Sequence, residues 1–528
     1  MILGAWSGHD ASYAIVGDDG SLKSHCELER HIREKEVAAD SIAWFLCHHK
    51  TMSEVAAIAT CHSAALVKQH RATHGIPVHV IGHHEAHAAD ARYSSHFDEC
   101  AILIVDGGGY EDAAGATVAT SLWRSRSPAL LEPVMKIQES DLNIGGLWTR
   151  ATRYIFGLES GWPYGHQAGS VMAMAALGDP SRFAARFRAA MTVDRAAANK
   201  APLGHVRGMS AKDPKRPKHP YFADLETLAL SDRQTMFDLA ASLQAVTEEK
   251  LEQLVTSALS VSDNVCLSGG VALNSVAAGK LLTRFGEEKL HIPPVPYDGG
   301  LCIGAARHYA HVIMKRSWTP SADWSVPYLG SACSAGEISA AVASAGLRTT
   351  QATDRDAIDA LDSGEILAVL CGRAESGRRA LGHRSIIADP RRADMKERVN
   401  ERVKHRQSYR PFAPSVLREH VVDWFQRDAS SPYMSFVLQL KPEKIALVPA
   451  IAHLDGSARV QTLTKADNDW YYDFVKLWHE RSRVPMLLNT SFNDREPICE
   501  TAEHAVRCFA QTDIDALYFP ELGLMARR

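Results

Sequence analysis

The sequence predicts an α/β protein of two or more domains, and three observations support this fold class. The chain has 528 residues, which is too long for a single hydrophobic core. Short apolar runs such as 101–105 end in aspartate and glycine, as buried strands do at their carboxyl ends. Apolar positions recur at helical spacing across 232–259. Strands and helices therefore alternate along the chain, which is typical of an α/β fold.

The predicted strands form a pattern that occurs twice. Ile2–Trp6 is expected to form a strand, and Ala11–Val16 and Leu22–Leu28 a hairpin that follows it. The same order of strand, Asp/Gly turn and short strand recurs across 101–120. We interpret this recurrence as a weak internal duplication. It favours a two-lobed, actin-like ATP-binding fold with the ligand between the lobes.

Two histidines and two aspartates form a candidate metal site. His83 and His87 are four residues apart in an alanine-rich stretch, so both imidazoles are expected on one face of a helix. Taken alone, such a pair is more often structural. Asp106, at the tip of the strand 101–105, is a candidate third ligand, and Asp298, before two glycines, is a candidate fourth. Such a set can hold a divalent metal with coordination positions left open.

Glycine-rich turns provide candidate phosphate sites. Gly107 and Gly108 follow Asp106 directly, where flexible backbone can approach a phosphate or its metal. Gly269 and Gly270 follow a predicted strand and precede a helix start at Asn274. Backbone N–H groups at such a turn can bind phosphate, although a Gly-Gly turn alone is weak evidence.

A strongly basic segment lies in the second half of the chain. Residues 373–410 contain twelve Lys/Arg against five Asp/Glu, which predicts an anionic ligand. We favour a small-molecule phosphate over RNA, because Arg contacts phosphate oxygens in pairs and aromatic residues come only at the end of the segment. Arg459, Ser491 and Asn493 are candidate partners of the same ligand.

Composition excludes some classes of protein and sets the domain boundary. The net charge of -4 argues against a general nucleic-acid binder, and no apolar stretch is long enough for a membrane span. Ten cysteines without CxxC spacing favour a reducing cytoplasm. Prolines and serines in 315–333 indicate a boundary, so we expect domains at 1–320 and 330–528. The aperiodic basic stretch 188–220 is expected to be a loop and could border a substrate.

A series of motifs points to a known family. In chain order they are GHDAS, HHEAHAA, VDGGG, LSGGVALNS, PYDGG, GRRALGHRSIIADPR, VKHRQSYRPFAPSV, DGSARVQT and NTSFN. With these motifs the sequence resembles the NodU/CmcH-type O-carbamoyltransferases over nearly its whole length. These enzymes carbamoylate hydroxyl groups of nodulation factors and antibiotics. The resemblance is specific for the family but not for the acceptor.

The resemblance implies a division of labour between two domains. A C-terminal YrdC-like domain would make carbamoyl adenylate from carbamoyl phosphate and ATP with Mg²⁺, and the N-terminal actin-like domain would transfer the carbamoyl group to a hydroxyl of a small molecule such as a natural product or sugar. The residues implied for the first step are Arg379, Lys404, Arg410, Arg459, Ser491 and Asn493, with Arg384 at the nucleotide. For the second step they are His83, His87, Asp106 and Asp298 as metal ligands, with His9 and Lys35 near the acceptor. Iron is the favoured metal, with zinc and manganese as alternatives; a homodimer is one alternative for the oligomeric state.

The sequence departs from the family pattern at a few positions. Arg378 stands where the family has proline, Ser170 where it has lysine and Ala173 where it has glycine. The changes at Ser170 and Ala173 imply an altered nucleotide contact in the N-terminal domain, and the change at Arg378 alters a loop of the C-terminal domain. Two other functions therefore stay open: tRNA threonylcarbamoylation, which uses similar domains, and a nucleotide-binding regulatory protein without transfer activity.

Overall fold

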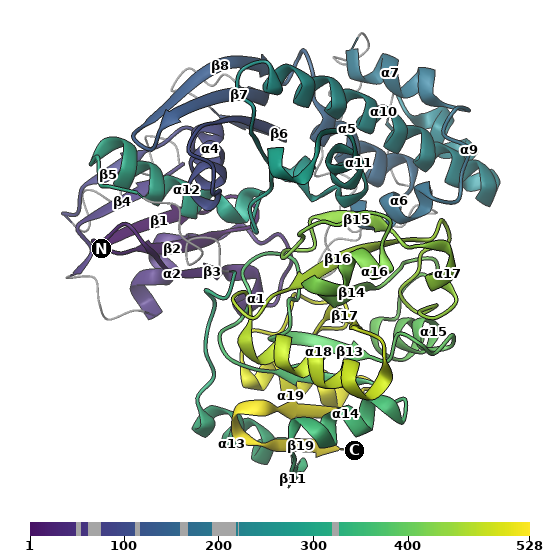
Figure 1. Cartoon of the computed structure of the whole chain (residues 1–528). Coiled ribbons are helices and arrows are strands. Elements are labelled where there is room, and N and C mark those ends of the chain that lie inside the picture. The colour runs from purple at the N-terminus through teal and green to yellow at the C-terminus, as the bar shows by residue number, and fades with distance from the viewer. Residues whose placement is uncertain are drawn as a thin grey trace. The chain divides into compact units, whose positions relative to one another are not determined.

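A computed structural model describes residues 1–48, 54–61, 75–110, 117–158, 167–192, 218–219, 221–318 and 327–527. The chain divides into two compact units, Met1–Ser325 and Val326–Arg528 (Figure 1). Most of the predicted loop 188–220 lies outside the described residues. None of the described helices has the length and apolar character needed to cross a membrane.

The first unit contains two sheets of identical topology. The first sheet has the order β3-β2-β1-β4-β5 and the second the order β10-β9-β6-β7-β8. In each sheet the first strand pairs antiparallel with the second and parallel with the fourth. The strands are β1 (Ile2–Trp6), β2 (Ser12–Val16), β3 (Leu22–Glu27), β4 (Ala57–Thr60), β5 (Val78–Val80), β6 (Cys100–Tyr110), β7 (Thr117–Ser127), β8 (Leu130–Gln138), β9 (Val265–Ser268) and β10 (Leu290–His291). The internal duplication and the two-lobed, actin-like fold predicted from the sequence are therefore confirmed.

The strand β6 lies at the centre of the second sheet. Its apolar residues 101–105 are completely buried, because β7 and β9 flank the strand and helices cover it. The strand runs further than predicted, through Asp106 and the three glycines to Tyr110. Its pairing with β7 shifts register between Val105 and Gly109, so the strand is irregular where the candidate metal ligand lies.

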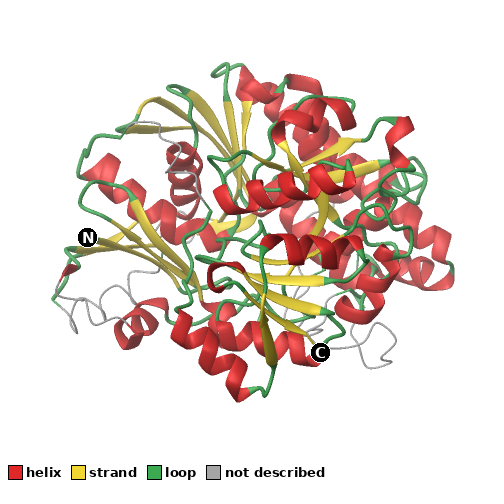
Figure 2. Cartoon of the chain, turned by 60° about the horizontal axis from the view of Figure 1, so that its bottom comes forward, coloured by secondary structure: helices red, strands yellow, loops and turns green. Residues whose placement is uncertain are grey.

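Helices of the first unit pack against both of its sheets. Figure 2 shows the helices of the chain in red and its strands in yellow. The longest, α10 (Arg233–Leu259), matches the predicted 232–259, and Asp232 caps it by accepting from the Thr235 N–H at 2.8 Å. The others include α1 (Leu28–Ile32), α2 (Ser41–His48), α4 (His83–Ser94), α5 (Ile144–Arg150), α6 (Ala168–Ala175), α7 (Ala184–Thr192), α9 (Ala223–Ser231), α11 (Ser275–Phe285) and α12 (Leu301–His308).

Two of these helices are exchanged between the lobes. Helix α4, which follows the first sheet in the chain, packs against β6 and β9 of the second sheet. Helix α12, which follows the second sheet, packs against β1, β2 and β4 of the first. The two helices also contact each other at Gly304, where an added Cβ would lie 1.9 Å from the carbonyl oxygen of Ala86. Only glycine permits this approach of the two backbones.

The second unit is built on one mixed sheet of nine strands in the order β11-β19-β18-β12-β13-β17-β14-β16-β15. The strands are β11 (Arg348–Gln351), β12 (Leu367–Leu370), β13 (Arg384–Ala388), β14 (Ala413–Leu417), β15 (Phe436–Gln439), β16 (Ser457–Leu463), β17 (Met486–Ser491), β18 (Ala516–Phe519) and β19 (Leu524–Arg527). The helices include α13 (Ala335–Ser344), α14 (Asp354–Asp362), α15 (Met395–Val399), α16 (Val421–Trp424), α17 (Pro442–Ile445), α18 (Asp469–Ser482) and α19 (Ala502–Gln511). The α/β class predicted for this half is confirmed.

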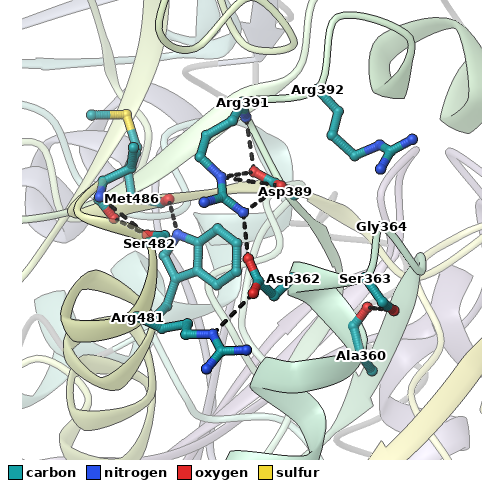
Figure 3. A network of polar contacts seen from close by, with 12 residues as sticks. Ala360, Asp362, Ser363, Gly364, Asp389, Arg391, Arg392, Arg481, Ser482 and Met486 are labelled. Carbon is teal, nitrogen blue, oxygen red and sulfur yellow. Dashed lines mark hydrogen bonds and ion pairs between the residues drawn. The ribbon is translucent and has the colours of Figure 1, made fainter.

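A polar network fastens the helices of the second unit to the end of β13 (Figure 3). Arg391 donates to Asp389 at 2.9 Å and to Asp362 of α14 at 2.6 Å. Asp362 also accepts from Arg481 of α18 at 2.9 Å. One arginine thus joins the segment after β13 to α14, and through Asp362 to α18. These bonds give Arg391, a member of the basic segment 373–410, a structural role.

Candidate metal centre and anion site

The four predicted metal ligands come from three separate elements. His83 and His87 lie one turn apart at the start of α4, Asp106 lies in β6, and Asp298 begins a 3-10 turn directly before α12. Their exposed fractions are 4%, 1%, 8% and 4%. The exchange of α4 onto the second sheet brings the histidines to Asp106, and the start of α12 adds Asp298.

The ligand atoms of these residues, which we call the His2Asp2 cluster, converge on one point. One donor atom from each residue lies within 4.8 Å of the others. His83 Nε2 is 3.2 Å from Asp106 Oδ2 and 3.7 Å from Asp298 Oδ1. His87 Nε2 is 3.8 Å from Asp106 Oδ2 and 3.5 Å from Asp298 Oδ1. Two imidazole nitrogens thus face two carboxylate oxygens.

The electrostatics of the His2Asp2 cluster suit a cation. Burial disfavours charge on His87, yet the carboxylates of Asp106 and Asp298 raise its pKa to about 9. Burial alone would raise the pKa of Asp106, but His83 and His87 hold it well below its usual range. His87 Nε2 is buried without a well-formed hydrogen bond among the described residues. The carboxylates therefore need positive charge at this point, and a divalent metal fits the donor set.

Two glycine turns lie against Asp106. The Gly270 N–H donates to Asp106 Oδ1 at 2.9 Å, which orients the carboxylate toward the histidines. The Gly107 carbonyl accepts from Asn143 Nδ2 at 2.8 Å. Asn274, predicted to contact a cofactor, caps α11 by accepting from the Ala277 N–H at 3.1 Å, and this bond gives it a structural role.

Gly109 leaves room for the imidazole of His83 in the His2Asp2 cluster. An added Cβ at this position would lie 2.3 Å from the imidazole carbons of His83. We therefore expect Gly109→Ala to displace His83 and to weaken metal affinity roughly 10- to 100-fold, as loss of ligand orientation does. Metal titration followed by mass spectrometry measures the change. Gly336→Ala, where a Cβ meets nothing within 4 Å, is the matched control and should bind metal as the wild type does.

The residues predicted near the acceptor lie in the first lobe. His9 is 68% exposed on its side chain, and its Nε2 is 3.3 Å from Asp298 Oδ2. The charge of Asp298 raises the pKa of His9 to about 10. Lys35 is half-buried in the turn that follows α1. His9 is thus beside the His2Asp2 cluster and open to solvent on its other side.

Sequence reasoning missed the residues that hold Asp298. The Gly299 carbonyl accepts from Ser12 Oγ at 2.9 Å and lies 2.9 Å from His25 Nε2. Both partners are buried in the strands β2 and β3. Ser12 ends the motif GHDAS and His25 lies in no motif, but the sequence does not show that either side chain contacts a backbone carbonyl nearly 300 residues away in the chain.

In the second unit the predicted residues Lys404, Ser491 and Asn493 lie together. Lys404 Nζ donates to the Ser491 carbonyl, to Asn493 Oδ1 at 2.7 Å and to the Asn493 carbonyl at 2.8 Å. Ser491 Oγ donates to Asn493 Oδ1 at 2.7 Å. Lys404 is 3% exposed and ends a π-helical turn, whereas Ser491 ends β17. The turn after β17 is thus organised around one buried ammonium group.

Several arginines gather at the same end of this sheet. Burial lowers the pKa of Arg459, and the charges of Arg379 and Arg410 lower it further. Burial, Arg410 and Arg459 likewise lower the pKa of Arg406, which sequence reasoning did not single out. Arg459 Nε is buried and has no hydrogen-bond partner within the described part of the chain. These four guanidiniums, the arginine cluster, repel one another, and an anionic ligand would relieve that repulsion.

A buried polar network holds the backbone beside Arg379. Asn489 Nδ2 donates to the Ala380 carbonyl at 3.1 Å, and Gln461 Nε2 donates to the Leu381 carbonyl at 3.0 Å. On the same loop, Glu375 Oε1 accepts from the N–H groups of Leu381 at 2.7 Å and His383 at 2.8 Å. The sheet and a buried carboxylate therefore fix the loop from two sides.

Arg384 takes a different role from the one predicted. Its side chain is completely buried and donates to the carbonyl oxygens of Glu500 at 3.2 Å and Ser331 at 3.0 Å. It also donates to the carbonyl oxygen of Cys371 at 2.5 Å. These bonds use the guanidinium to join loops, so we assign Arg384 a structural role. Ser170 is likewise completely buried, inside α6.

Comparisons with known proteins place the chain in a family. The model of the carbamoyltransferase N-terminus matches residues 12–307, and that of the carbamoyltransferase C-terminus matches residues 358–525. Nodulation protein NolO of Bradyrhizobium diazoefficiens is 31% identical over 452 residues, which are 83% of this chain and 77% of NolO. An uncharacterised protein of Synechocystis is 34% identical over 478 residues, 82% of this chain and 74% of that protein.

Among solved structures, full-length HypF in its phosphate- and nucleotide-bound form aligns with 60% of this chain and 56% of its own, at 14% identity and a TM-score of 0.35. We draw nothing from so distant a likeness. The family models, together with relatives that align over more than four fifths of the chain, are sufficient to show the family of this chain. The chain therefore belongs to the carbamoyltransferase family and is a carbamoyltransferase.

Proposed function

We propose that the protein is an ATP-dependent O-carbamoyltransferase. The second unit makes carbamoyl adenylate from carbamoyl phosphate, ATP and one water, releasing phosphate and pyrophosphate. The first unit transfers the carbamoyl group: the acceptor hydroxyl oxygen bonds to the carbamoyl carbon, AMP leaves, and the hydroxyl gives up its proton. The acceptor is a small molecule with a free hydroxyl group.

The observation that carries this proposal is the arginine cluster beside Lys404. Carbamoyl phosphate and the phosphates of ATP are all anionic, so bringing them together requires fixed positive charge. Arg406 and Arg459 supply such charge, since only burial and other cations shift their pKa values. Lys404 holds the turn with Ser491 and Asn493 in place beside them.

The His2Asp2 cluster supports the transfer step in the first unit. His83, His87, Asp106 and Asp298 would hold a divalent ion, with iron favoured over zinc and manganese, which would supply Lewis-acid chemistry to the transfer. Asp298 raises the pKa of His9 to about 10, so the imidazole is already protonated at neutral pH. His9 can accept the acceptor's proton at Nε2 only when Asp298 is engaged elsewhere. Ser12 and His25 keep Asp298 in place through the Gly299 carbonyl.

Pyrophosphate release tests the proposed first step. The purified protein is given ATP, Mg²⁺ and carbamoyl phosphate, with each omitted in turn and no acceptor. We expect release that requires both ATP and carbamoyl phosphate. Release that instead requires bicarbonate and threonine would contradict the proposal and favour tRNA threonylcarbamoylation. A screen of hydroxylated small molecules, read by mass increase, then identifies the acceptor.

A further inference from the structure

Two cysteines of the second unit lie against each other and against a glutamate. Cys499 and Cys508 are 0% and 1% exposed. One ligand atom from each cysteine and one from Glu496 lie within 4.8 Å of one another. Cys508 belongs to α19, whereas Glu496 and Cys499 belong to the segment that follows β17. The two cysteines are nine residues apart without CxxC spacing, so no motif marks this group and only the fold brings it together.

The three side chains suit a zinc ion. Thiolate sulfur favours zinc over harder divalent ions, and a carboxylate oxygen is a common further ligand. Two sulfurs bound to one tetrahedral zinc at about 2.3 Å lie roughly 3.8 Å apart. The present spacing therefore closes onto an ion with a shift of about 1 Å or less. Three protein ligands leave the fourth position of the tetrahedron to a water molecule.

The charges around the group also balance when zinc is bound. The hydrogen bond with Cys499 and burial raise the pKa of Cys508 well above its usual range, and the charge of Lys404 opposes this rise. Both cysteines therefore keep their protons until a metal ion displaces them. Two thiolates, one carboxylate and one divalent ion carry a net charge of -1, which the nearby ammonium group of Lys404 offsets.

The carboxylate connects this buried group with solvent. The side chain of Glu496 is 23% exposed, and its Oε2 is 3.8 Å from Arg507 Nη2. A partly exposed ion pair at this distance is weak, so the carboxylate can turn to a metal ion at little cost. A thiol pair alone can pack as two small apolar groups. The carboxylate beside the thiols distinguishes this group from such packing, because a carboxylate next to sulfur needs a cation.

We propose that Glu496, Cys499 and Cys508 form a structural zinc site, separate from the His2Asp2 cluster. Binding forms two Zn–S bonds and one Zn–O bond and releases the two thiol protons to solvent, and no electrons are transferred. The site does not depend on the proposed function. It fastens α19 to the segment after β17.

The segment that the zinc would fasten is already folded back on itself. The Cys499 N–H donates to the Phe492 carbonyl at 2.9 Å, and Asn493 Nδ2 donates to the Glu496 carbonyl at 2.6 Å. Cys499 Sγ donates to the carbonyl of His504, in the first turn of α19, at 3.4 Å. An ion bound here replaces this weak sulfur hydrogen bond with metal–ligand bonds between the same two elements.

Cobalt tests the site in the full-length protein. Co²⁺ occupies zinc sites, and thiolate ligands give it an intense sulfur-to-metal charge-transfer band in the near ultraviolet. The His2Asp2 cluster contains no sulfur and gives no such band. The protein is reduced with a phosphine, stripped of metal and titrated with CoCl2. We expect the band to saturate at one Co²⁺ per chain and to disappear when ZnCl2 is added.

Cys499→Ala and Cys508→Ala should both lose the band. Cys371→Ala is the matched control: Cys371 is also buried in the second unit but is not one of the three converging residues, so its band should equal that of the wild type. If the first two variants are insoluble, Glu496→Gln provides the test. It keeps both sulfurs and should show the band at a weaker cobalt affinity.

Three results would overturn the inference. The first is wild-type protein without the band, and the second is a band that persists in both Cys499→Ala and Cys508→Ala or an affinity unchanged in Glu496→Gln. The third is a disulfide between the two cysteines, found by peptide mapping of protein isolated without added oxidant, because it would use up both sulfur ligands. Pyrophosphate release is not part of this readout, so a failure of the proposed function would leave the zinc site standing.

Discussion

Lys404→Ala should lower carbamoyl-phosphate-dependent pyrophosphate release by roughly 10²- to 10³-fold, the loss that follows removal of one fixed charge stabiliser. Lys404 is buried, and its ammonium group binds the carbonyls of both Ser491 and Asn493. Its removal takes away a cation and releases the turn that carries these side chains. Initial rates at saturating ATP measure the effect, with circular dichroism as a check of folding.

Arg402→Ala is the matched control for this prediction. Arg402 lies two residues before Lys404 on the same π-helical turn, but its side chain is 37% exposed and pairs with Asp515 at 3.3 Å. Loss of this surface ion pair should cost less than about 1 kcal/mol and leave the rate unchanged. Equal rates for Lys404→Ala and the wild type would exclude Lys404 from the first step.

His87→Ala should remove the metal and with it the transfer step. The variant loses one of four buried donor atoms. Metal affinity should fall by roughly 100-fold or more, because loss of a residue that only orients a ligand already costs about 10- to 100-fold. Pyrophosphate release in the absence of acceptor should persist, because that reaction is assigned to the second unit. Metal content by plasma mass spectrometry and product formation with an identified acceptor give the two readouts.

His84→Gln controls for the loss of a buried histidine in α4. The ring of His84 lies next to that of His83, but its Nδ1 is 2.7 Å from Ser121 Oγ and it is not one of the four converging residues. Its metal content should match that of the wild type. Full metal content in His87→Ala would remove the His2Asp2 cluster from the proposal.

The sequence predicted elements whose pattern is local. The helical period of 233–259 and the apolar run 101–105 identify α10 and the core of β6, because each pattern reports directly on burial. The repeated strand order predicted the two lobes. The exchange of α4 and α12 could not be predicted from the sequence, because the pattern of an amphipathic helix does not indicate which sheet its apolar face will cover.

The candidate sites show the same limit. The residues of the His2Asp2 cluster could be singled out because each lies at a strand or helix end with its own glycine or histidine signal, and that they bind a metal stays a prediction. Arg406 was not singled out, and Arg384, predicted at the nucleotide, donates to backbone carbonyls; both are single members of a basic segment. Arg384 lies in β13 and donates to backbone carbonyls, whereas Arg406 follows the π-helical turn 400–404 and lies among other cations, and no local pattern distinguishes the two places.

The exchange of helices makes each half of the first unit dependent on the other. Either half, expressed alone, would have to present a sheet without the helix that the other half provides. The repeats should therefore unfold in one transition, and a chain cut between α4 and β6 should regain its fold only when both fragments are mixed. The two repeats thus form one folding unit, because each sheet is covered by a helix from the other repeat.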